Sequence, residues 1–216
     1  MNLKKKFSDS DLQRIKAAVK EAESKVSGEI VPVMVERSGV YAIAGYRAAL
    51  AFAAITFLSI VIFDRYVPEL AIYDPLIIFI TVLTFGFVGG LLAHFWDPAK
   101  RLMLTQLHMD KATRLKAESA FLEQEVFNTR QRTGIMIFIS FFEHEVIVMA
   151  DKGISKVVDQ REWDQMVRLL IEKIKNGDTI GGLEHCIKQC GQILLQNNFT
   201  IAADDVNELN DDLRIG

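Results

Sequence analysis

The sequence predicts an α/β domain into which two membrane-spanning helices are inserted. Half of the 216 residues are apolar although 25% are charged, and the apolar residues are concentrated between Tyr41 and Trp96. On both sides of that stretch, helical periodicity alternates with short runs rich in valine and isoleucine, as in α/β domains. The net charge of −3 gives no basic footprint, so nucleic-acid binding is not expected.

The two apolar stretches cover residues of about 42–63 and 76–96. Each has about the 20 residues that a helix needs to cross a hydrocarbon core about 30 Å thick. The linker between them is too short to form a domain, so the helices are expected to form an antiparallel hairpin. Its partner is the lipid bilayer.

The orientation of the hairpin follows from the positive charges near its ends. The linker carries only Arg65, whereas the flanking segments carry Lys25, Arg37, Arg47, Lys100, Arg101, Lys111, Arg114 and Lys116. Positive residues are enriched on the cytoplasmic side of membranes. The sequence therefore predicts a multi-pass protein of the inner (plasma) membrane with both termini in the cytoplasm.

Small residues recur every three to four positions in both predicted spans, at Gly45, Ala49 and Ala53 in the first and at Gly86, Gly90 and Ala93 in the second. Such stripes let helices approach closely. We expect them to pack within the hairpin. The alternative is packing between protomers, which would make the protein a homo-oligomer.

Residues 1–40 are expected to form the first part of the cytoplasmic domain, followed by the hairpin at 41–97. Ser8 and Asp11 resemble a capping box that begins a helix, and Gly28 is expected to end it. The run Glu29–Glu36 is a predicted buried strand, in which Pro32 favours an edge position or a bulge.

Residues 98–200 are expected to complete the domain. A polar helical segment reaches about Thr129, two strands follow at Ile135–Phe141 and Glu145–Ala150, and two amphipathic helices follow these. The order of elements predicts a three-layer α/β/α sandwich with the hairpin inserted after its first strand. Residues 201–216 form an acidic tail that is expected to be solvated and mobile.

Few residues suggest chemistry, and the catalytic residues are unknown. The sequence has no phosphate-binding loop of the Walker type, no EF-hand and no nucleophile elbow. Cys186 and Cys190 lie one helical turn apart and are interpreted as core residues. Glu29 and Asp151 stand at predicted strand ends, where carboxylates serve as caps or as ligands of Ca²⁺ or Mg²⁺.

The chain resembles the TPM-domain family, in its membrane-hairpin bacterial branch. The resemblance rests on "FSDSDLQRIKAAVKEAESKVSGEIVPVMVE", on "NTRQRTGIMIFISFFEHEVIVMADKGI" and on the closing "GQILLQNNF". Its most specific parts are Ser27-Gly28-Glu29, Arg132-Thr133-Gly134 and Ala150-Asp151-Lys152-Gly153-Ile154. The chain departs from the family at Glu143-His144, where Glu-Arg is expected, and at Asn198-Phe199-Thr200, where relatives tend to have Phe-Pro.

The resemblance implies an α/β/α sandwich and a choice between two functions. Relatives act in photosystem II repair or modulate a membrane receptor, which implies a membrane-anchored interaction module that assists assembly, maintenance or regulation of membrane protein complexes. Some members have weak acid-phosphatase activity and some bind calcium, which implies the alternative, a metal-dependent phosphatase at the inner membrane surface. Glu29 and Asp151 would then bind Ca²⁺ or Mg²⁺, and Arg132 would contact an anion. A transporter accessory subunit is a third hypothesis.

Overall fold

The computed structural model describes residues 3, 6–67, 69, 71–201 and 207–216. The chain divides into two compact units, Met1–Ser38 together with Asp110–Gly216, and Gly39–Met109. The second unit therefore extends beyond the predicted end of the hairpin at residue 97. It includes helix α4 (Asp97–Leu102), after which the carbonyl of Met103 accepts a hydrogen bond from Arg47 at 3.0 Å.

Helix α1 (Asp9–Glu23) begins with the predicted capping box, because Ser8 accepts from the Asp11 amide and Asp11 accepts from the Ser8 amide. The prediction that Gly28 ends this helix is wrong. The helix ends at Glu23, and the Ser24 amide closes the last turn. Gly28 instead permits a close approach, since a Cβ atom there would lie 2.6 Å from the side chain of Leu194.

The sheet has four strands in the order β3-β2-β1-β4. Strand β1 (Glu29–Val35) is parallel to β2 (Gly134–Ser140), which forms an antiparallel hairpin with β3 (Glu145–Ala150). The short β4 (Arg214–Ile215) pairs with β1 only at Val33 and Met34. Pro32 pairs with Ile137 of β2 on one side and has no partner in β4 on the other. Its position in β1 is therefore an edge position, as predicted.

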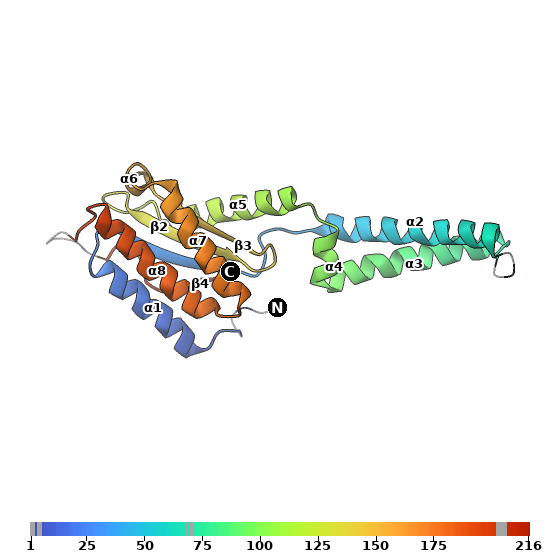
Figure 1. The fold of residues 1–216 in the computed structure, drawn as a ribbon, viewed down its shortest axis with the longest axis horizontal. Helices are drawn as coiled ribbons and strands as arrows, with labels where there is room; N and C mark the ends of the chain where they lie inside the picture. Colours follow the sequence, from blue (N-terminus) through green and yellow to red (C-terminus); the bar gives the residue numbers. More distant parts are fainter. Residues whose placement is uncertain (1–2, 4–5, 68, 70, 202–206) are drawn as a thin grey trace. The chain divides into compact units, whose positions relative to one another are not determined.

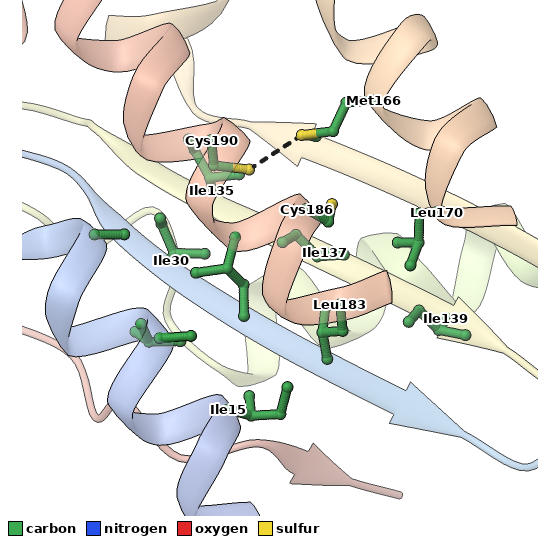
Figure 2. Close-up of a cluster of buried hydrophobic side chains, with 14 of the residues drawn as sticks. Ile15, Ile30, Ile135, Ile137, Ile139, Met166, Leu170, Leu183, Cys186 and Cys190 are labelled. Atoms are coloured by element: carbon green, nitrogen blue, oxygen red, sulfur yellow. Dashed lines mark hydrogen bonds between the residues drawn. The ribbon is translucent and has the colours of Figure 1, made fainter. Parts of the chain in front are cut away.

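Both faces of the central strands are covered. Helices α1, α7 (Gln160–Lys175) and α8 (Thr179–Gln196) pack on one face (Figure 1), where the core includes Ile15, Ile30, Ile137, Leu170 and Leu183 (Figure 2). The other face packs against helix α5 (Gln106–Glu123) through Ala117 and Ala120. This burial explains why β1 and β2 are apolar without alternation.

Two helices, α2 (Ala42–Tyr66) and α3 (Pro75–Phe95), are long and apolar enough to cross a membrane, and most of their side chains are exposed. Their small residues pack within the hairpin, as predicted. A Cβ atom on Gly86 would lie 3.2 Å from the Ala49 carbonyl oxygen, and one on Gly90 would lie 3.4 Å from the Ala49 Cβ atom. The sequence pattern missed Gly89, which makes room for the ring of Phe52.

The prediction of a solvated, mobile tail is wrong for residues 207–216, while residues 202–206 lie outside the described part of the chain. The segment ends in strand β4, and Leu213 and Ile215 pack against the main core. Leu209 packs on the other side of the sheet. These apolar side chains hold the acidic segment on the domain because their burial outweighs the tendency of its charges to stay solvated.

Candidate functional site

One edge of the sheet brings together the three most specific sequence motifs. Glu29 pairs with Gly134 at the start of β1 and β2, and the Asp151 amide donates to the Gly134 carbonyl at 2.9 Å. Glu29 and Asp151 therefore flank Gly134 at the same edge, and their backbones are two strand spacings, or about 10 Å, apart across the sheet. The sequence placed both carboxylates at strand ends, and the structure brings these ends to one edge, which we call the motif edge.

At the motif edge, Asp151 is paired with Arg132. The guanidinium donates from Nε and Nη2 to the two carboxylate oxygens at 2.5 and 3.0 Å, and the pairing raises the pKa of Arg132. Asp151 also caps the short helix α6 (Lys152–Ser155) by accepting from the Lys152 amide at 2.7 Å. The Asp151 side chain is only 5% exposed, so its charge is balanced from within the protein.

The backbone around Arg132 is held in a rarely populated conformation. Its φ of +59° lies in the left-handed region, which disfavours residues with a Cβ atom. The Arg132 carbonyl accepts from the Gly153 amide at 2.9 Å, and the Thr129 hydroxyl accepts from the Thr133 amide at 2.9 Å. Any Cβ atom on Gly153 would lie 2.6 Å from the Arg132 carbonyl oxygen. These contacts give a structural reason for the residues of the Arg132-Thr133-Gly134 and Asp151-Lys152-Gly153 motifs.

Glu29 is buried beneath the C-terminal segment. Its carboxylate accepts from the amides of Glu208 and Leu209 at 3.0 and 3.3 Å. Burial raises the pKa of Glu29, and these two hydrogen bonds offset part of the increase. The contact was not predicted because the tail was interpreted as solvated. The signal was present in the spacing of Leu209, Asp211, Leu213 and Ile215, whose alternate positions are all buried or half-buried.

Glu23 is a half-buried acid that the sequence analysis missed. One oxygen accepts from the Ile30 amide at 2.7 Å, and the other is buried without a hydrogen-bond partner among the described residues. Burial raises its pKa to about 9, and the negative charges of Glu29 and Asp211 add to the effect. Glu23 and Glu29 line a cavity of about 200 Å³. At neutral pH, Glu23 therefore holds a proton.

The residues proposed for metal binding are engaged by protein groups. Glu29 is bound by two backbone amides, and Asp151 by Arg132 and Lys152. Among residues 6–67, 71–201 and 207–216, no group of three acidic, histidine or cysteine side chains is arranged to hold a metal ion. Asp204 and Asp205 lie outside these ranges. Metal binding at Glu29 and Asp151 therefore stays a prediction.

The two cysteines belong to the core, as interpreted from the sequence. Both are buried free thiols on α8, and the Sγ atom of Cys190 lies 3.5 Å from the Sδ atom of Met166 (Figure 2). The hydrogen bond with Cys186 and burial raise the pKa of Cys190, which keeps it protonated. A buried thiol of this kind is unreactive.

The turn between β2 and β3 lies at the opposite edge of the sheet. His144 has a φ of +56°, which suits a tight turn. Glu143 is buried and accepts from the Ser38 amide at 2.9 Å and from the Ser140 hydroxyl. Glu143 thus joins the ends of β1 and β2, because Ser38 follows β1 and Ser140 ends β2.

Comparison with known proteins gives a likeness of fold. No family model matches the chain, and no curated protein matches it. The NMR structure of the BA42 protein from the psychrophilic bacterium Bizionia argentinensis aligns with a TM-score of 0.60 and 18% sequence identity, over 97% of this chain and 95% of that one. At this identity the likeness concerns the fold alone.

Proposed function

We propose that this protein is a membrane-anchored interaction module of the TPM type, which assists assembly, maintenance or regulation of membrane protein complexes. The observation that carries the proposal is the exposed apolar hairpin inserted into an α/β unit. The helices on both faces of the sheet support a three-layer TPM-like sandwich. The neutralised charges at the motif edge favour a structural role for that edge over catalysis.

The membrane topology is part of this proposal. Helices α2 and α3 cross the inner membrane, and both termini and the α/β unit are cytoplasmic. Cysteine labelling tests this topology. In a Cys186→Ala, Cys190→Ala background, one variant carries a single cysteine in place of Glu69 in the linker, and another carries one in place of Lys156 in the α/β unit. In intact cells, a membrane-impermeant thiol reagent is expected to label position 69 alone. Labelling of position 156 without permeabilisation would contradict the orientation.

A partner in the membrane is tested by photocrosslinking of the full chain. A photoreactive residue replaces Leu83 on α3 or Leu122 on α5, which are both 62% exposed. We expect a defined adduct with another membrane protein in native membranes. The same variants in synthetic vesicles are the control and should give no adduct with another protein. Lipid adducts alone in native membranes would contradict the proposal, and an adduct of two copies of this chain would replace it by a homo-oligomer.

The phosphatase alternative is favoured by one observation, the presence of Glu29, Asp151 and Arg132 at the same edge of the sheet. In that function the two carboxylates would hold Ca²⁺ or Mg²⁺, and Arg132 would have to release Asp151 to contact a phosphoryl oxygen. Such a rearrangement would break the bidentate ion pair between Arg132 and Asp151.

Hydrolysis of a phosphate monoester by the purified full chain tests the alternative. The interaction module predicts no turnover that depends on Ca²⁺ or Mg²⁺. Metal-dependent turnover that is lost in both Glu29→Gln and Asp151→Asn, while Glu172→Gln retains it, would establish the phosphatase. Circular dichroism of each variant must match the parent, since both carboxylates also hold the fold.

A further inference from the structure

A cavity of about 660 Å³ opens at the edge of the sheet opposite the motif edge. It is lined by the end of β2 and the start of β3, and the end of β1 lies beside it, since Val35 pairs with Ser140. The ends of α7 and the starts of α1 and α8 complete its wall. Its volume falls in the range of small-molecule sites, and ligands of open α/β sheets bind beyond the carboxyl ends of parallel strands.

Much of the cavity lining is apolar. Phe7 and Phe141 line the cavity with ring centroids 6.3 Å apart, and Ile171, Ile174 and Ile180 add aliphatic surface. A ligand with an apolar body would gain by removing this surface from water.

The acidic side chains that line the cavity are already engaged. Asp11 accepts from the Ser8 amide at 3.0 Å, and Asp178 accepts from the Gly181 amide at 3.0 Å, so both serve as helix caps. Burial raises the pKa of Glu145, and a hydrogen bond with Thr113 opposes that increase. Each carboxylate therefore has a role in the fold or a reduced tendency to be charged.

Two cations of the lining remain available. Arg14 is committed to Glu184 by two hydrogen bonds of 2.8 and 3.0 Å. Within the described part of the chain, neither Lys6 nor Lys175 has a carboxylate partner. The Lys6 ammonium lies 4.6 Å from the centroid of the Phe141 ring, which belongs to the apolar part of the lining. The cavity thus combines two ammonium groups with apolar surface.

We propose that this cavity binds an amphiphilic anion, a molecule with an apolar body and one carboxylate or phosphate group. Lys6 and Lys175 bind the anionic group by charge-assisted hydrogen bonds, and the phenylalanine and isoleucine side chains contact the body. Such a ligand comes either from lipid breakdown or from the pool of soluble esters and acids. This binding is separate from the motif edge and from the proposed interaction with a membrane protein.

Calorimetric titration of the full chain in lipid nanodiscs tests the proposal, with empty nanodiscs subtracted. Octanoate represents acids derived from lipids, and 1-naphthyl phosphate represents soluble esters. We expect saturable binding of at least one of them with one ligand per chain, and much weaker binding of 1-octanol and inorganic phosphate. The better of the two anions identifies the source of the ligand.

Variants of the lining distinguish this site from adsorption to the membrane. Lys6→Met with Lys175→Met is expected to weaken binding about tenfold or more, as loss of charge-assisted hydrogen bonds does. Ile174→Trp should fill the cavity and weaken binding as well, whereas the exposed Lys156→Met should change nothing. Because the lysines are exposed, their loss leaves the fold intact even where Ile174→Trp does not.

Three outcomes would overturn the proposal. One is the absence of saturable binding of either anion up to about 1 mM. Another is equal affinity for 1-octanol, which would show that the charge is not recognised. The third is unchanged affinity in the Lys6→Met, Lys175→Met variant.

Discussion

Replacement of Arg132 by leucine is expected to lower the free energy of unfolding of the α/β unit by clearly more than replacement of an exposed arginine that has no buried partner. Removal of one partner of a buried ion pair costs about 3–5 kcal/mol, because the other charge is left buried. Asp151 is 5% exposed, but the Arg132 side chain is 49% exposed, so water lowers the cost. In the variant, the Asp151 carboxylate would still accept the hydrogen bond from the Lys152 amide, but it would lose the positive charge of Arg132.

Chemical denaturation in a nonionic detergent measures this effect. The protein has two tryptophans, and Trp163 is buried in the α/β unit. In a Trp96→Phe background, its fluorescence reports unfolding of that unit alone. The exposed Arg168→Leu on α7 is the matched control and should cost less than about 0.5 kcal/mol. Arg132→Leu combined with Asp151→Asn should cost less than the two separate losses added, because the two residues interact directly.

The same variant separates the two functions proposed for Arg132. A structural pair predicts lower stability and no effect on any phosphate-dependent signal. An anion contact predicts the reverse, because an arginine that faces a ligand would not be needed to balance Asp151. Unchanged stability of Arg132→Leu would therefore contradict the structural interpretation of the motif edge.

The sequence predicted that Glu29 and Asp151 stand at strand ends, because strand ends follow from local patterns, but it left open whether the two ends meet. Glu29 stands at the start of a buried strand, and Asp151 follows the second strand of a hairpin, so both reach the same edge once β1 and β2 pair in parallel. The hairpin of α2 and α3 was equally predictable, since its apolar length and its stripes of small residues are local features.

Long-range contacts could not be predicted in the same way. The amides of Glu208 and Leu209 reach Glu29 across the whole chain, and the short β4 gives almost no strand signal of its own. The acidic composition of the tail favoured solvation, and only its alternating apolar positions indicated docking. Arg132, which pairs with Asp151, has a left-handed backbone that residues with a Cβ atom rarely adopt, and local patterns do not indicate it.

Replacement of Glu23 by glutamine is expected to raise the free energy of unfolding at pH 7 by about 2–3 kcal/mol. Burial raises the pKa of Glu23 from the ordinary 4.5 to about 9 in the folded protein. Between these two values the folded state binds more protons than the unfolded state, so stability falls as the pH rises, by up to about 1.4 kcal/mol per pH unit. Glutamine is neutral at every pH and can still accept from the Ile30 amide.

The stability of the parent protein should therefore be highest below about pH 4.5 as far as Glu23 is concerned, decline as the pH rises, and level off above about pH 9. The raised pKa of Glu29 acts in the same direction. Denaturation at a series of pH values, followed by Trp163 fluorescence in the Trp96→Phe background, measures the slope. The exposed acid Glu172 on α7 provides the control, since Glu172→Gln should leave the slope unchanged. A Glu23→Gln variant with the parent's slope would contradict the prediction.

The part of the protein that is destabilised when Glu23 ionises can also be identified. Ionisation of Glu23 places a negative charge beside the carboxyl groups of Glu29 and Asp211, and Asp211 belongs to the docked C-terminal segment. The segment is the element that can move away, because it is held by the short β4 and by two hydrogen bonds that its backbone amides donate to Glu29. Hydrogen-exchange protection factors of the Glu208 and Leu209 amides should therefore fall between pH 7 and pH 9 in the parent and stay constant in Glu23→Gln. Equal losses in both proteins would assign the pH dependence to Glu29 instead, since that carboxylate is present in each.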